Sequence, residues 1–345
     1  MSIEFRQISK RYGDASSPLV VECIDFQVPS GSLTTILGPS GCGKTTVLRM
    51  IAGLETPSAG QVLIDGRDVT ALAAAERNVS MVFQSYALFP HMDVGANVRY
   101  GLSVSGVSKD EATRRARNAM DSVGLTGFEQ RMPSELSGGQ QQRVAVARSL
   151  VLEPSVLLFD EPLSNLDARL RRSMREEIRA LQQRLQLTVA YVTHDQSEAL
   201  AVSDQIVVMN AGRIAQAGTP RQLYEQPSSA FVAGFMGEAL LFDAEVDANG
   251  QVRLGPLRFV SRQPVAPGAV KVAVRPEAWR LGPAGGPGLP ATVTKTAYLG
   301  HGQELSFDTE LGSVFVVSAD VGASWQPGQA LSLSLGATGV SVVAA

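Results

Sequence analysis

The most informative segment of this chain is Gly38-Pro39-Ser40-Gly41-Cys42-Gly43-Lys44-Thr45. It follows a short run of strand-forming residues, Leu33 to Leu37, and precedes a helical stretch, Thr45 to Ala52. Glycines let successive backbone N–H groups point at an anion, and the amino end of the next helix adds partial positive charge. The stretch therefore predicts a loop that holds the phosphates of a nucleotide between a strand and a helix.

Two side chains in this loop have a direct chemical role. Lys44 can reach the outer phosphates of a nucleotide, and the Thr45 hydroxyl can coordinate Mg²⁺. We expect nucleotide contacts along the whole loop and into the first turn of the helix, from Gly38, Pro39, Ser40, Gly41, Cys42, Gly43, Lys44, Thr45 and Thr46.

A second apolar run, Val156 to Phe159, ends in two carboxylates, Asp160 and Glu161. If this run is a strand that stops beside the phosphate loop, both carboxylates face the metal and the attacking water. Asp160 would then help to hold Mg²⁺, and Glu161 would orient or deprotonate the water. The alternative is an acidic strand end at a turn, with no chemical role.

Up to about residue 235, strand-like runs alternate with amphipathic helices, which predicts an α/β sheet with helices on its faces. Ser108, with Glu111 three positions later, predicts a capping box at the start of one helix. A second helix carries apolar residues at helical spacing, namely Leu170, Met174, Ile178, Leu181 and Leu185.

Beyond residue 240 the pattern changes to alternation, interrupted by Gly and Pro turns. Examples are Val270, Val272 and Val274, and later Leu331, Leu333 and Leu335. This alternation predicts a small all-β domain, and a barrel is favoured over an open sheet because closure removes exposed edges. We therefore expect two domains, residues 1–238 and 239–345.

Bulk composition supports a soluble globular protein of about two domains, since 44% of the 345 residues are hydrophobic and 18% are charged. Net charge is −3, from 30 basic and 33 acidic side chains, so no positive field attracts nucleic acid, and no nucleic-acid partner is expected. Cys23 and Cys42 are the only cysteines, which suits a reducing cytosol.

Membrane-targeting signals are also missing from the sequence. Residues 1–10 alternate polar and apolar side chains, unlike a signal peptide, and no window approaches the roughly 18 apolar residues of a membrane span. We expect a chain that neither crosses a membrane nor leaves through one.

A second anion site is predicted at Ser137-Gly138-Gly139-Gln140. Ser137 and Gln140 have the spacing of a capping box, and the two glycines expose N–H groups at a helix amino end. One chain thus carries two ends suited to phosphate.

Leu136-Ser137-Gly138-Gly139-Gln140, followed by Gln141-Gln142-Arg143, resembles the signature motif of the ATP-binding cassette family. Further matches occur in the family's order and spacing. Tyr12 resembles the aromatic that stacks on adenine, Gln84 the glutamine of the Q-loop, residues 164–167 the D-loop, and His194 the switch histidine.

This resemblance implies a P-loop NTPase cassette with a mixed sheet and a helical signature subdomain at about 88–155, followed by an OB-like barrel of the TOBE type. It implies ATP and Mg²⁺ as ligands and Glu161, His194, Lys44 and Gln84 as the catalytic residues. Thr45, Gln84 and Asp160 would hold the metal. Asp160 and Gln84 would also contact ATP, as would Ser137, Gly138, Gly139, Gln140 and Asp167, with the signature residues reaching the nucleotide of a partner subunit.

Other segments of the sequence resemble the corresponding segments of ATPases from bacterial importers that carry a C-terminal β domain. They are residues 191–199, Phe235-Met236-Gly237, residues 274–277 and Tyr298-Leu299-Gly300. Residues 85–92 resemble the segment that forms a groove for a permease helix. The implied partners are a second copy of the chain, integral membrane permease subunits and, indirectly, an extracytoplasmic solute-binding protein. The implied location is the cytoplasmic face of the bacterial inner membrane.

Two segments are most similar to the ATPases of ferric iron importers. They are residues 170–179 and the sequence Asp-Gln-Ser-Glu that follows His194. ATPases for polyamine, sulfate, phosphonate and sugar import are similar too. The resemblance implies that none of these residues touches cargo, since a separate binding protein and the permease select it. Two other readings are a soluble cassette ATPase of DNA repair or translation and a nucleotide-binding regulator without hydrolysis. The β domain could bind a small regulator or extend a dimer interface.

Overall fold

The computed structural model describes residues 1–344, and the chain divides into two units, Met1–Pro220 and the residues from Arg221 onward. The first unit is built on a six-stranded sheet in the order β10-β9-β3-β8-β7-β6. All neighbouring strands of this sheet are parallel except β9 and β10. The strands are β3 Leu33–Leu37, β6 Val79–Val82, β7 Val156–Asp160, β8 Thr188–Thr193, β9 Gln205–Asn210 and β10 Arg213–Gly218.

A second, antiparallel sheet in this unit has the order β2-β1-β4-β5. Its strands are β1 Ile3–Arg11, β2 Leu19–Val28, β4 Ala59–Ile64 and β5 Arg67–Asp68. Helix α1, Lys44–Ala52, shares one apolar core with both sheets, in which Val47, Leu48 and Ile51 are fully buried. The helix that starts at the phosphate loop is therefore held from both sides.

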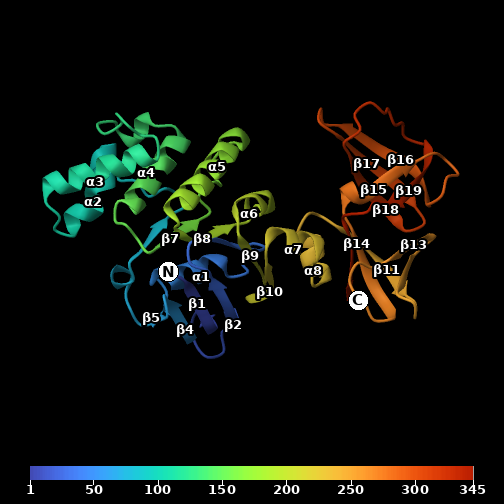
Figure 1. Ribbon diagram of the computed structural model, residues 1–345, viewed down its shortest axis with the longest axis horizontal. Helices are drawn as coiled ribbons and strands as arrows, with labels where there is room; N and C mark the ends of the chain where they lie inside the picture. Colours follow the sequence, from blue (N-terminus) through green and yellow to red (C-terminus); the bar gives the residue numbers. More distant parts are fainter. Residues whose placement is uncertain (345) are drawn as a thin grey trace. The chain divides into compact units, whose positions relative to one another are not determined.

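The opposite face of the six-stranded sheet is covered by helices α5, Ala168–Leu185, and α6, Gln196–Val202. Helices α2 Val94–Val104, α3 Lys109–Ser122 and α4 Gly138–Leu150 share a separate core. Figure 1 shows these three helices gathered on one side of the unit. Short 3₁₀ turns occur at Ala74–Glu76 and Pro133–Glu135. No helix within residues 1–344 is long and apolar enough to span a membrane.

The second unit begins with two short helices, α7 Pro220–Glu225 and α8 Ala230–Phe235. Ten strands follow in two five-stranded antiparallel sheets, in the orders β13-β12-β11-β14-β20 and β15-β19-β16-β17-β18. Their inward residues form one common core. The strands are β11 Leu240–Val246, β12 Gln251–Leu254, β13 Leu257–Val260, β14 Gly268–Val274, β15 Trp279–Gly282, β16 Leu289–Tyr298, β17 Gln303–Thr309, β18 Gly312–Ser318, β19 Ala330–Leu335 and β20 Val340–Ala344, with a 3₁₀ turn at Pro276–Ala278.

The fold class expected from the sequence is confirmed, an α/β cassette followed by an all-β domain whose two sheets form half-barrels. The structure divides the chain earlier than residue 238, however, and groups α7 and α8 with the β domain. Arg275 contributes to this grouping, because it is 3% exposed and donates to the carbonyl oxygens of Met236 and Tyr224. Its guanidinium also lies 3.6 Å from the centre of the Tyr224 ring.

Two local expectations need correction. Ser108 is the residue before α3, but its hydroxyl caps no backbone N–H, and Glu111 instead accepts two hydrogen bonds from Arg114. The capping box predicted there is wrong because a nearby guanidinium competes for the carboxylate. On α5 the predicted apolar face is buried at Met174, Ile178 and Leu181, whereas Leu185, in the last turn, is 45% exposed.

Candidate functional site

Several of the predicted functional side chains follow the carboxyl ends of three adjacent strands. In the sheet, β8 lies between β3 and β7. The phosphate loop follows β3, Asp160 ends β7, and His194 comes directly after β8. Because these strands are parallel, their carboxyl ends meet at one sheet edge, where open α/β sheets commonly bind ligands.

Glycine is required at two positions of the phosphate loop. Gly43 has a φ of 104°, a conformation that residues with a side chain rarely adopt. A Cβ atom at Gly38 would lie 2.4 Å from the carbonyl oxygen of Met209 on β9. At Gly38 the loop packs directly on the backbone of the sheet. These two positions therefore have no room, or no suitable backbone conformation, for a side chain.

Lys44 is only 6% exposed, and its ammonium is held by the loop itself. Nζ donates to the carbonyl oxygens of Gly38 at 2.8 Å and Pro39 at 2.9 Å. These bonds hold the Lys44 ammonium group next to the phosphate loop. From this position the ammonium group can reach a bound phosphate.

Thr45 and Asp160 form the predicted metal-binding pair. The Thr45 hydroxyl donates to Oδ1 of Asp160 over 3.3 Å. Burial raises the pKa of the Asp160 carboxyl, the Thr45 hydrogen bond opposes this, and the neighbouring Glu161 charge adds to it. A hydroxyl with one carboxylate fits Mg²⁺, which usually takes few protein ligands and completes its shell with phosphate and water oxygens. Within residues 1–344, no group of three or more His, Cys, Asp or Glu side chains is placed to hold a metal ion.

Glu161 and His194 are brought together as a pair. Nδ1 of His194 lies 3.1 Å from Oε2 of Glu161, and the two side chains are 58% and 22% exposed. Glu161 has a φ of 46°, and its backbone N–H donates to the Val192 carbonyl at 3.0 Å. A strained conformation held by a neighbouring strand is typical of residues fixed for a chemical role.

A small cavity of about 30 Å³ lies beside this pair, which is room for a water molecule. It is lined by Glu161, Ser164, Arg171, Thr193, His194, Asp195 and Glu198. A water there would be within reach of both a carboxylate and an imidazole.

Sequence reasoning missed the buried group that supports His194. Glu198 is 3% exposed and accepts hydrogen bonds from the hydroxyls of Tyr191 and Thr193, the latter at 2.7 Å. Burial raises the pKa of the Glu198 carboxyl, and the two hydroxyl donors oppose that rise. Thr193 Oγ1 in turn accepts from the Asp195 N–H at 3.0 Å, so both neighbours of His194 are tied down. The spacing of Asp195 and Glu198 was a usable signal, because an acidic residue three positions after a helix cap marks a helix start.

Gln84 contacts the D-loop. Its side-chain amide nitrogen donates to the Ser164 hydroxyl at 3.2 Å, and its main-chain carbonyl oxygen accepts from the Asn165 side chain at 3.1 Å. Ser164 in turn donates to the Glu161 carbonyl oxygen at 3.0 Å. The predicted metal ligand is therefore linked to Glu161 through Ser164, and a role at the metal requires its side chain to turn. Asp167, also predicted at the nucleotide, caps α5 by accepting from the Leu170 N–H at 2.9 Å.

The signature segment forms the predicted capping box. Gln140 accepts from the Ser137 N–H at 2.9 Å, and Ser137 Oγ accepts from the Gln140 N–H at 3.4 Å. A Cβ atom at Gly139 would lie 2.9 Å from Leu170, and one at Gly138 would lie 3.1 Å from Leu166. The glycines thus allow α4 to pack on the D-loop and α5.

Tyr12, the expected adenine platform, is 44% exposed. The ammonium of Lys10 lies 4.8 Å from the centre of its ring and is itself bound to Glu55 at 3.0 Å. An exposed ring held at one face is suited to stacking with a base on the other.

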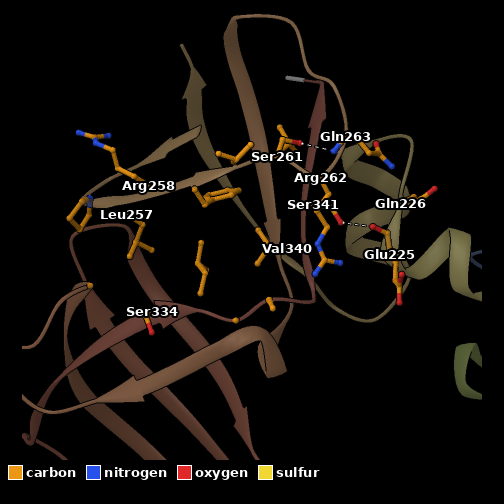
Figure 2. A pocket seen from close by; sticks show the side chains of 18 of the residues that line it. Glu225, Gln226, Leu257, Arg258, Ser261, Arg262, Gln263, Ser334, Val340 and Ser341 are labelled. Carbon is orange, nitrogen blue, oxygen red and sulfur yellow. Dashed lines mark hydrogen bonds between the residues drawn. The ribbon is translucent and has the colours of Figure 1, made fainter. Parts of the chain in front are cut away.

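The second unit contains a larger cavity of about 590 Å³. Figure 2 shows it between β13, β20 and the end of α7, with Val340 near Ser341 and Arg262 on one side and Leu257 next to Arg258 on the other. Ser341 donates to the Glu225 carbonyl oxygen at 3.0 Å at its edge. The size and mixed lining suit a small molecule.

Known proteins resemble this chain throughout. Residues 21–164 match the ABC transporter family and residues 272–343 match the TOBE domain. The Fe(3+) ions import ATP-binding protein FbpC of Agrobacterium fabrum is 52% identical over 99% of this chain and 98% of its own length. The corresponding protein FbpC 1 of Rhizobium meliloti is 53% identical with the same coverage, and that of Photorhabdus laumondii is 49% identical over 97% of this chain and 90% of its own length.

Two solved structures resemble the first unit. A dimeric ATP-binding cassette in a post-hydrolysis state with ADP and phosphate aligns with a TM-score of 0.57 and 29% identity, covering 64% of this chain and 99% of that one. The cbiO1 protein of Clostridium perfringens, part of the ABC transporter complex cbiONQ, aligns with a TM-score of 0.60 and 28% identity, covering 64% and 90%.

Thr193→Val tests the support of His194. The isosteric change removes the bonds to Glu198 and Asp195, so we expect the free energy of unfolding to fall by about 2 kcal/mol, measured by urea denaturation. Thr34→Val on the adjacent strand is the matched control, because the Thr34 hydroxyl is equally buried and has no hydrogen-bond partner in the described structure. The control should change stability by less than about 0.5 kcal/mol. Equal losses in both variants would contradict the assignment.

Proposed function

This chain belongs to the ABC transporter family, and from that premise we propose that it hydrolyses ATP, with Mg²⁺, as the paired motor subunit of a bacterial ferric iron importer. The observation that carries the hydrolytic role is the Glu161–His194 contact of 3.1 Å, next to the Thr45–Asp160 pair at the same sheet edge. A regulator without hydrolysis would need no such pair. Similarity over 97% to 99% of this chain to proteins named for Fe(3+) import supports the cargo.

The chemistry follows from the positions of the side chains. Tyr12 would stack on adenine, the loop N–H groups and Lys44 would hold the phosphates, and Thr45 and Asp160 would hold Mg²⁺, joined by Gln84 once its amide leaves Ser164. When bound, the metal would neutralise charge at the phosphate oxygens. Glu161 orients a water for attack on the terminal phosphorus and accepts its proton, and His194 keeps that carboxylate in place. The bond to the β,γ-bridging oxygen breaks, and ADP and phosphate leave.

We propose that the active unit is a homodimer in which each ATP lies between the phosphate loop of one copy and residues Ser137–Gln140 of the other. Similarity to a cassette solved as a dimer supports this arrangement. Asp167, near the signature through Leu166 and Leu170, would lie at the same junction. ATP then closes the pair, and loss of the terminal phosphate reopens it.

Transport requires partners that this chain does not supply. We propose that residues 85–92 receive a helix of separate integral membrane permease subunits, which places the chain at the cytoplasmic face of the inner membrane. A solute-binding protein on the other side would select the cargo. We propose residues 1–238 as the functional cassette and residues 239–345 as a regulatory or dimerising β domain, although α7 and α8 pack with the β domain in the structure. The cavity near Arg262 supports a regulatory role.

Glu161→Gln should preserve ATP binding and accumulate a stable ATP-bound dimer, because only activation of the water is lost. We expect the turnover number to fall at least about a hundredfold. Size-exclusion chromatography with Mg²⁺ and ATP would detect the dimer, and the same run with ADP is the control. Turnover near that of the unmodified protein would refute the role of Glu161.

A mixed dimer tests the composite sites. With Lys44→Ala in one subunit and Ser137→Arg in the other, both changes fall on the same site and the second site stays intact. We expect about half of the ATP sites to bind nucleotide, whereas both changes in one chain, paired with an unmodified chain, should damage both sites. Stoichiometry measured with a labelled ATP analogue distinguishes the two pairings. Equal stoichiometry in both would contradict shared sites.

Cargo is tested with the intact importer in vesicles. We expect ATP-dependent accumulation of radiolabelled ferric iron, and none with the Glu161→Gln chain. Polyamine, sulfate, phosphonate and a sugar serve as competing solutes. Accumulation of one of these without ferric iron would remove the iron assignment and leave the motor role intact.

A further inference from the structure

We propose that Arg148, near the carboxyl end of α4, is the positioning residue that fastens the permease-facing segment to the signature helix. Through this attachment, ATP contact at Ser137 of the same helix would be transmitted to residues 85–92. The inference rests on the proposed function, since it assigns a mechanical connection between the two surfaces that function requires.

The segment contains an unusual turn. Tyr86 has a φ of 59° and Ala87 a φ of 48°, so two successive residues with side chains adopt the left-handed conformation. Such residues seldom do so even singly, because Cβ crowds the next carbonyl. A turn of this kind persists only when surrounding groups hold it.

Arg148 supplies that hold. Its two terminal nitrogens donate to the carbonyl oxygens of Ala87 at 2.6 Å and Tyr86 at 2.9 Å. Its guanidinium also lies 5.8 Å from the centre of the Phe89 ring, within cation–π range. Burial lowers the pKa of Arg148, and the guanidinium forms no ion pair within residues 1–344. These carbonyls are therefore its main polar partners, and a desolvated charged donor binds them strongly.

A second attachment fixes the rest of the segment to the helical group. Asn97 of α2 is fully buried, accepts from the Phe89 N–H at 2.8 Å, and donates to the carbonyl oxygens of Phe89 at 3.1 Å and Met92 at 2.9 Å. Helices α2 and α4 share one apolar core. The Phe89 ring, 4.6 Å from that of the 41% exposed Tyr100, is thus carried by the same group of helices as the signature.

The other end of the segment is attached to the nucleotide side, where Gln84 contacts Ser164 and Asn165. The left-handed turn therefore lies where the two sets of attachments meet. Arg148 follows Ser137 by eleven positions, so one helix of about 16 Å joins the signature to this turn. A shift of α4 has a direct route to the surface offered to the permease.

Hydrogen exchange of the full chain in the Glu161→Gln background tests this connection. In that parent, Mg²⁺ with ATP should slow amide exchange at residues 137–141 and at residues 85–91. Adding Arg148→Gln should leave the slowing at 137–141, while amides 85–91 exchange about tenfold faster and no longer respond to ATP. Arg114→Gln is the matched control, because that exposed arginine pairs only with Glu111 on its own helix, and it should behave as the parent does.

The outcomes separate the two levels of the argument. If the parent shows no ATP effect at 137–141, the shared nucleotide site is refuted and this inference with it. If 137–141 respond but 85–91 either never respond in the parent or still respond in Arg148→Gln, only the role of Arg148 is overturned.

The Arg148→Gln variant could lose protection from hydrogen exchange along the whole chain. In that case a second variant, Arg148→Lys, provides the test. A lysine retains one charged donor for the two carbonyls, so exchange at 85–91 should be intermediate and its ATP response reduced. A purely structural arginine would change the melting temperature without changing the ATP response. Parent-like exchange at 85–91 in the lysine variant would therefore overturn the proposal.

Discussion

Parallel pairing of β3, β8 and β7 is the constraint on which the site depends. Parallel strands in register end together, so a phosphate loop, a strand-end aspartate and a histidine far apart in sequence reach one edge. Helix α1, packed between two sheets, then fixes the loop from behind. Neither element alone would produce a site, because the loop without Asp160 lacks a metal ligand and the carboxylates without the loop lack a phosphate.

Much of this arrangement could be predicted from sequence because local patterns carried it. The glycine spacing around Lys44 predicted the loop, and the apolar run before Asp160 predicted the strand that positions it. The Ser137–Gln140 capping box forms as predicted, with each side chain accepting from the backbone N–H of the other residue. At Ser108 the same rule failed, since Arg114 takes the Glu111 carboxylate.

Long-range contacts were beyond the reach of sequence patterns. Glu198 belongs to the first turn of α6, yet its carboxylate turns inward to Tyr191 and Thr193 on β8. Likewise, the side-chain contact of Gln84 with Ser164 depends on two loops that only the folded sheet brings together. In each case the residue type was visible, and its partner was set by tertiary packing.

The hydrogen bonds from Arg275 to the carbonyl oxygens of Met236 and Tyr224 limit how domains of such chains can be exchanged. A hybrid that joins the cassette of one transporter to the β domain of another is naturally cut where helical periodicity fades, near residue 238. A junction near residue 238 would place the buried Arg275 guanidinium against backbone from the other transporter. A junction before α7 instead transfers Arg275 together with both of its carbonyl acceptors. The exchangeable module of this architecture therefore begins with two helices, although most of its regular secondary structure is strand.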